Sequence, residues 1–237
     1  MRTRPADAAD ENETAGQEGY SETFHTFTSM NKELERYIER EIIPRYEDFD
    51  AAHRTDHVRT VIAQSLELAA HYDADADMVY TVAAYHDTGL ANGRERHHID
   101  AGRILAEDAE LRRRFTEEQI GIMREAVEDH RASSDHPPRT IYGRIVAEAD
   151  RVIDPATIVR RTVQYGLANY PALDREGHYA RCLAHLQKKY AEGGYLRLWI
   201  AESDNARRLE ELRAIIRDPQ RLRRLFDETF DAETAAE

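Results

Sequence analysis

Residues 80–89 read YTVAAYHDTG, an apolar run that ends in an adjacent histidine and aspartate. Val79, Val82 and His86 are spaced as neighbours on one face of a helix, and Asp87 lies about 100° further round. We therefore expect both polar side chains to point into the protein. A buried carboxylate has to be paired, protonated or bound to a cation, and an imidazole beside it favours a cation. Taken alone, the pair also fits a core histidine that is hydrogen-bonded to its neighbour, so the rest of the chain has to decide.

Length, charge and cysteine content narrow the class of protein. With 237 residues, of which 41% are hydrophobic, the chain can form one fair-sized core. Its formal net charge of −13 argues against a general nucleic-acid binder and against a membrane-surface binder, so an anionic ligand would need local cations. The single cysteine, Cys182, fits a reducing compartment, and we find neither a signal-peptide core nor a transmembrane run. We expect a cytoplasmic protein.

The distribution of large apolar residues predicts the domain boundaries. Residues 1–22 are rich in acidic and small side chains, and this segment is expected to form a disordered tail. Patterns with helical spacing then continue through one domain at 23–232, so the predicted fold is all-α. Within it we expect a motif-bearing core at about 50–159 and C-terminal helices at 160–232, followed by a short tail at 233–237.

Further histidines and an aspartate fall on the apolar faces of predicted helices. His130 continues the apolar stripe of a helix that begins with a capping box at residues 116–119. Asp150 shares a face with Val146 and is expected to point inward. The first turns of two other predicted helices also carry histidines, which are His57 and the pair His97 and His98.

Two helix boundaries can be predicted from local signals. Gly89 follows the histidine–aspartate pair and can adopt the left-handed conformation that ends many helices. Beyond the glycines at 193 and 194, apolar spacing predicts a helix over residues 195–216. Trp199 in that helix could stack on a nucleotide base, but a position in the core or between helices is the more frequent use of tryptophan.

The order of these residues resembles the HD-domain superfamily of metal-dependent phosphohydrolases. The resemblance covers about residues 50–159 and implies an all-α helical bundle. It implies one divalent ion, of Mn, Fe, Co, Ni, Zn or Mg, bound by His57, His86, Asp87 and Asp150. Four segments look like those typical of the superfamily, namely 57–61, 85–90, 128–131 and 145–151.

A subset of that superfamily binds two ions. It adds one histidine near the start of the helix after the His-Asp pair and another at the end of the following helix. The resemblance implies His98, with His97 as the second choice, for the first of these roles and His130 for the other. Asp87 would then bridge the ions. A site with one ion stays open on the sequence alone.

The implied activity is hydrolysis of a phosphate ester or anhydride by metal-activated water. Two ions about 3.5–4 Å apart can acidify a water molecule and stabilise the attacking and leaving oxygens. We expect a small phosphorylated substrate, with a nucleotide favoured. Asp87 and either Glu128 or Asp129 would be the catalytic carboxylates. The expected phosphate-binding cations are Arg131, Arg139, Arg151, Lys188 and Lys189.

Two other functions stay open. The same six-ligand pattern occurs in HD-type di-iron oxygenases, and ligand identity does not separate them from the hydrolases. A non-catalytic sensor that binds metal and nucleotide without turnover is the third class, and the complete ligand set argues against it. The sequence does not decide the oligomeric state, so a homo-oligomer is also open.

Overall fold

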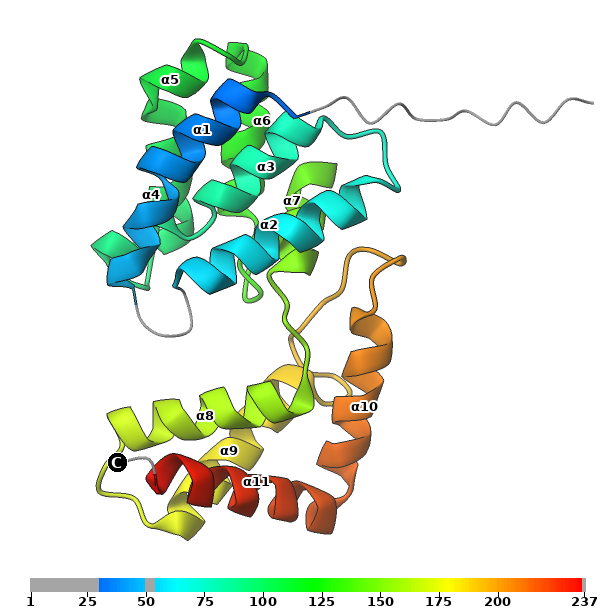
Figure 1. The fold of residues 1–237 in the computed structure, drawn as a ribbon. Coiled ribbons are helices and arrows are strands. Elements are labelled where there is room, and N and C mark those ends of the chain that lie inside the picture. The colour runs from blue at the N-terminus through cyan, green and yellow to red at the C-terminus, as the bar shows by residue number, and fades with distance from the viewer. Residues whose placement is uncertain (1–29, 50–53, 236–237) are drawn as a thin grey trace, which may run out of the picture.

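The computed structural model describes residues 30–49 and 54–235, and every regular element in these ranges is a helix (Figure 1). The predicted all-α fold is confirmed for this part of the chain. The tail predicted at 1–22 lies outside the described residues. In chain order the elements are α1 (Lys32–Glu41), η1 (Ile43–Asp48), α2 (Thr55–Ala69), α3 (Ala76–Tyr85), η2 (Thr88–Asn92), α4 (His97–Glu107), α5 (Ala109–Arg112), α6 (Glu117–Glu128), α7 (Ile141–Ala149), α8 (Pro155–Asn169), α9 (Arg175–Tyr190), α10 (Asn205–Arg217) and α11 (Pro219–Thr234).

Helix α3 is the central element of the first group of helices, α1 to α7. It begins at Asp75, whose side chain accepts hydrogen bonds from the amides of the first turn. Every residue from Met78 to Tyr85 is buried, and the helix contacts α2, α6 and α7. A helix that is apolar all round is stable only inside a core. Its C-terminal end therefore delivers the His86-Asp87 pair into the protein interior.

Helices α4 and α6 pack against each other beside α3. The capping box predicted at residues 116–119 is present, because Thr116 and Gln119 each bind the other's backbone amide. It starts α6 at the predicted place. Helix α4 also packs closely on the short helix η2, and this contact sets the position of its first turn.

Gly89 does not adopt the left-handed conformation expected from the sequence. Among the described glycines, positive φ angles belong to Gly93 and Gly193. A Cβ atom at position 89 would lie 2.6 Å from the amide nitrogen of Ala101 and closer still to the carbonyl oxygen of His97. The prediction was wrong because the close approach of η2 to α4, and not the turn geometry, requires glycine here.

Helices α8 to α11 enclose a second apolar core. The helix predicted over 195–216 is shorter than expected, since α10 begins only at Asn205. The preceding residues run back towards the first group of helices (Figure 1), where Ile200 is buried beside Ile145 of α7. They are not helical because the Trp199 amide donates to the Glu148 side chain. The single domain at 23–232 stays a prediction.

None of the described helices is both long enough and apolar enough to cross a bilayer.

Candidate metal centre

The first group of potential ligands consists of His57, His86 and Asp150. They lie in the first turn of α2 and at the C-terminal caps of α3 and α7. His57 Nε2 is 3.2 Å from Asp150 Oδ1 and 3.4 Å from His86 Nε2. One ligand atom from each residue lies within 4.8 Å of the other two. Ligand atoms about 2 Å from a shared ion would be separated by such distances.

The second group consists of Asp87, His97 and His130. His97 is the first residue of α4, and His130 follows the end of α6. The Oδ1 atom of Asp87 lies 3.5 Å from His97 Nε2 and 3.4 Å from His130 Nε2. The two histidine nitrogens are 3.2 Å apart. This group is therefore also suited to one metal ion.

Asp87 lies between the two groups. Its Oδ2 atom is 3.3 Å from His86 Nε2 and 3.8 Å from His57 Nε2, whereas its Oδ1 atom faces the second group. The residue is only 3% exposed. A carboxylate that presents one oxygen to each group has the geometry needed to bridge two ions.

Three of the histidines are oriented by the backbone. In each, Nδ1 lies within hydrogen-bond distance of the carbonyl oxygen three residues earlier, so Nδ1 carries the proton and donates it. In the neutral ring the Nε2 atom then has the lone pair and faces the centre of the site, which is the tautomer that a metal ligand needs. The Nδ1–O distances are 2.8 Å for His86, 2.6 Å for His130 and 2.8 Å for His97.

The ionisable groups of the site are strongly coupled. Burial by itself would lower the pKa of His86, but the carboxylates of Asp87 and Asp150 and the Ala83 carbonyl together outweigh it and raise the pKa to about 9. Burial likewise opposes ionisation of Asp87 and Asp150, yet His86 and His57, respectively, hold the pKa of each carboxyl below its usual range. The residues thus favour an arrangement of buried carboxylates with positive charge between them. A divalent cation can supply that charge in place of protons.

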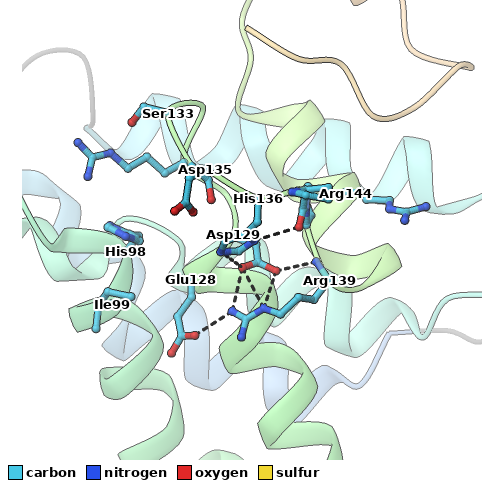
Figure 2. A pocket seen from close by; sticks show the side chains of 13 residues that line it. His98, Ile99, Glu128, Asp129, Ser133, Asp135, His136, Arg139 and Arg144 are labelled. Atoms are coloured by element: carbon cyan, nitrogen blue, oxygen red, sulfur yellow. Dashed lines mark hydrogen bonds and ion pairs between the residues drawn. The ribbon is translucent and has the colours of Figure 1, made fainter. Parts of the chain in front are cut away.

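From the sequence we preferred His98 to His97 as a ligand of the second ion. In the described part of the chain, His98 belongs to neither group of potential ligands. Its ring centroid lies 5.5 Å from that of His97, and its side chain lines the adjoining pocket (Figure 2). Burial and the nearby His130 lower the pKa of His98 to about 4. Neighbouring residues on a helix point about 100° apart, so only one of this pair can face Asp87. The geometry favours His97.

Asp129 and Glu128, the two candidates for a catalytic carboxylate, are both bound by Arg139 (Figure 2). The backbone amide of Arg139 donates to Asp129 Oδ2 at 2.7 Å, and its guanidinium donates to both oxygens of Asp129 at 2.8–3.1 Å. The same guanidinium lies 2.9 Å from Glu128 Oε2. Arg139, expected from the sequence to bind phosphate, is therefore occupied by carboxylates of the protein.

A pocket of about 870 Å³ next to the second group is lined by Glu128, Asp129 and Arg139 (Figure 2). Its other walls come from the start of α4, including His98, and from the loop that connects α6 to α7. Arg131 lies in that loop and donates to the carbonyl oxygen of Glu95 at 3.0 Å. The pocket thus adjoins the end of the site that contains His130.

Arg151 directly follows Asp150 and is only 7% exposed. Its Nε and Nη1 atoms are buried and have no hydrogen-bond partner among the described residues. Burial lowers the pKa of its guanidinium. Buried donors without a hydrogen-bond partner are costly, so these two atoms suit the side chain to an anionic ligand. Lys188 and Lys189, by contrast, lie in the last turn of α9, among the helices of the second core.

Glu148 was not singled out from the sequence. It is an acidic residue in an otherwise apolar run two positions before Asp150, and it is fully buried. That contrast is the one signal that could have identified it.

Fold and site together define an all-α protein in which helix ends bring two histidine–aspartate groups together. Residues 54–153 match the family model of the HD domain, and the predicted resemblance is confirmed over these residues. HD domains are in general metal-dependent phosphohydrolases that bind divalent ions. Searches of curated proteins and of solved structures gave no match.

Proposed function

We propose that this protein is a metal-dependent phosphohydrolase that cleaves a phosphate ester or anhydride bond in a small phosphorylated metabolite, with a nucleotide as the favoured substrate class. The observation that carries the proposal is the position of Asp87, with one oxygen towards each group of ligands. We assign the first ion to His57, His86 and Asp150. The second is assigned to His97 and His130, and Asp87 is shared.

Two divalent ions would supply Lewis acidity to this site, acidifying water and neutralising charge on phosphoryl oxygens. The protein's own contribution is preorganisation. Backbone carbonyls hold the rings of His86, His97 and His130, so little reorganisation is needed when a substrate arrives. Asp87 fixes the spacing between the two groups.

Arg151 is proposed to bind a phosphate oxygen of the substrate. A guanidinium can donate two parallel hydrogen bonds to phosphate, and the buried Nε and Nη1 atoms of Arg151 have unused donors. Arg131, at the wall of the adjoining pocket, is assigned to a more distant part of the substrate. Arg139 is assigned to Asp129 instead, and Lys188 receives no role here.

Glu128 is the better candidate of the two carboxylates for proton transfer. Both oxygens of Asp129 already accept hydrogen bonds from Arg139, and Asp129 is buried. Glu128 has one close contact with that guanidinium and lines the pocket. A general base needs a lone pair that can reach water or substrate, and Glu128 retains one on Oε1, which lies 3.5 Å from Arg124 Nε.

The proposal is tested by measuring phosphate release from a panel of nucleoside mono-, di- and triphosphates and from p-nitrophenyl phosphate. The protein is first purified without chelator and its metal content determined. We expect metal-dependent turnover that falls at least about 10³-fold in Asp87→Asn, since the amide cannot act as an anionic bridge. Glu107→Gln, at the C-terminal end of α4 with its side chain 64% exposed, is the matched control and should retain activity.

Absence of phosphate release by metal-loaded protein would overturn the proposal. Tightly bound iron with a mixed-valent electron paramagnetic resonance signal, together with that result, would favour the oxygenase class. Nucleotide binding without turnover would favour the sensor class.

A further inference from the structure

Glu148 is a fully buried carboxylate in the last turn of α7. Its Oε2 atom accepts a hydrogen bond from the backbone amide of Trp199 at 2.7 Å. Its Oε1 atom accepts from the Ser203 hydroxyl at 2.8 Å and from the Asn205 side-chain amide at 2.9 Å. All three donors come from a distant part of the chain, beyond the matched HD domain. We call residues 196–205 the docking segment.

The same contact also holds the backbone at the end of α7. Asn205 donates a second hydrogen bond to the carbonyl oxygen of Glu148 at 3.0 Å, and the Arg151 amide donates to that oxygen at 3.1 Å. The last carbonyls of a helix lack partners within the helix, and the final turn frays unless they are bound. Asp150 is the residue at this cap. The docking segment therefore restrains the turn that carries both Asp150 and Arg151.

Apolar contacts fix the docking segment from the other side. Ile200 is 5% exposed and shares a small cluster with Ala69 of α2, Val79 of α3 and Ile145 of α7. These are the three helices whose ends supply His57, His86 and Asp150. Figure 1 shows the segment, in orange, extending from the second group of helices towards α2 and α7.

We propose that Glu148 is a positioning residue that couples the C-terminal helices to the first metal group. By holding the docking segment against α7, it keeps Asp150 aligned with His57 and His86, and keeps Arg151 in place for the substrate phosphate. The inference rests on the proposed function of these residues as ligands. Metal binding by the HD domain then depends on the docking segment, which lies outside that domain.

Both side-chain oxygens of Glu148 act as hydrogen-bond acceptors in this contact. Glu148 meets three donors and offers only acceptors, whereas glutamine has the same shape but replaces one acceptor oxygen by an NH₂ donor. At least one buried donor then loses its partner. Aspartate is one methylene shorter and would draw the carboxylate away from the docking segment. Glu148→Gln is therefore a nearly isosteric test of the contact.

The experiment measures Mn²⁺ binding to the full chain by competition with a chelator. His57→Ala and His97→Ala identify which binding step belongs to which group. In Glu148→Gln we expect the affinity of the first group to fall about 10–100-fold, as for residues that orient metal ligands, while the second group keeps its affinity. Asn205→Ala should change the same step in the same direction.

A stability-matched control separates positioning from folding. Leu209→Ala removes a side chain that is buried in the second core, on the helix that begins at Asn205. It should lower the thermal midpoint and leave both Mn²⁺ affinities unchanged. If Glu148→Gln does not fold, Asn205→Ala carries the test, because it leaves the bonds from Trp199 and Ser203 to Glu148 intact.

The outcomes distinguish the two proposals. Absence of Mn²⁺ binding by the wild-type protein would overturn the proposed function and this inference with it. Two ions bound with wild-type affinity in both Glu148→Gln and Asn205→Ala, with only the thermal midpoint lowered, would overturn the inference and leave the proposed function intact.

Discussion

The Nε2 atom of His97 lies 3.5 Å from Oδ1 of Asp87, whereas the next residue, His98, turns towards the adjoining pocket. Both histidines lie in the first turn of α4. Because successive side chains on a helix diverge by about 100°, the choice between them depends on how α4 is rotated against α3 and α6. The second ligand group depends on this rotation.

His97→Ala is therefore expected to reduce the metal content from two equivalents to one, because the second group loses one of its three proposed ligands. His98→Ala, one position along the same turn, should retain both. Elemental analysis after gel filtration measures the result. If His98→Ala loses the second ion and His97→Ala keeps it, our assignment is wrong and the order favoured on the sequence is right.

Gly89→Ala should affect binding of the second ion by moving the backbone of α4. The added Cβ would lie 2.9 Å from the carbonyl carbon of His97, so the first turn of α4 has to move. We expect destabilisation of about 1–3 kcal/mol and loss of the second ion with the first retained. Chemical denaturation and metal analysis measure the two effects.

Gly121→Ala on α6 is the control for that substitution. A Cβ at this position meets no atom within 4 Å, and alanine is the better helix former. The free energy of unfolding of this variant should rise by about 0.5–1 kcal/mol, and both ions should stay bound. Equal destabilisation by the two alanines would contradict the role given to Gly89.

Arg151→Ala should separate stability from function. Because two buried donors of Arg151 have no hydrogen-bond partner among the described residues, its removal is expected to leave the thermal midpoint unchanged or higher. The KM for a phosphorylated substrate should rise about 10–100-fold, as for loss of a charge-assisted hydrogen bond. Steady-state kinetics measure this, with the exposed Arg160→Ala as control. An unchanged KM would remove Arg151 from the substrate site.

Arg139→Ala should show the opposite combination. Buried Asp129 would lose its guanidinium partner, so we expect the free energy of unfolding to fall by about 1–2 kcal/mol. Solvent screening limits this effect, because the Arg139 side chain is 39% exposed. KM should not change. Urea denaturation and kinetics are compared with Arg144→Ala, an exposed arginine of the same pocket. A higher KM with unaltered stability would restore the phosphate-binding role predicted from the sequence.

Cys182 provides a pH-dependent probe of the second core. It is 1% exposed, and burial raises the pKa of its thiol to about 11. Because the thiolate is the reactive form, labelling of the native protein at pH 8 should be slow and should accelerate about tenfold per pH unit below pH 11. Unfolding with urea should make labelling fast. Rapid labelling of the native protein at pH 8 would contradict this burial.

Local sequence signals predicted much of the fold. Apolar residues at helical spacing predicted an all-α chain, and the capping box at Thr116 and Gln119 predicted where α6 begins. The apolar run before His86 and Asp87 predicted that this pair is buried. These features depend on residues within one or two helical turns of each other, so the linear pattern contains them.

The features that the sequence left open depend on contacts between distant segments. The start of the predicted helix at 195–216 was misplaced because Glu148, some fifty positions earlier, binds the Trp199 amide. Gly89 was misread because its requirement comes from α4. The sequence alone determined which residue types lie on each buried helix face, since that follows from a helical period. Only the tertiary structure decided that His97 and not His98 meets Asp87, because the rotation of one helix against another is set by packing.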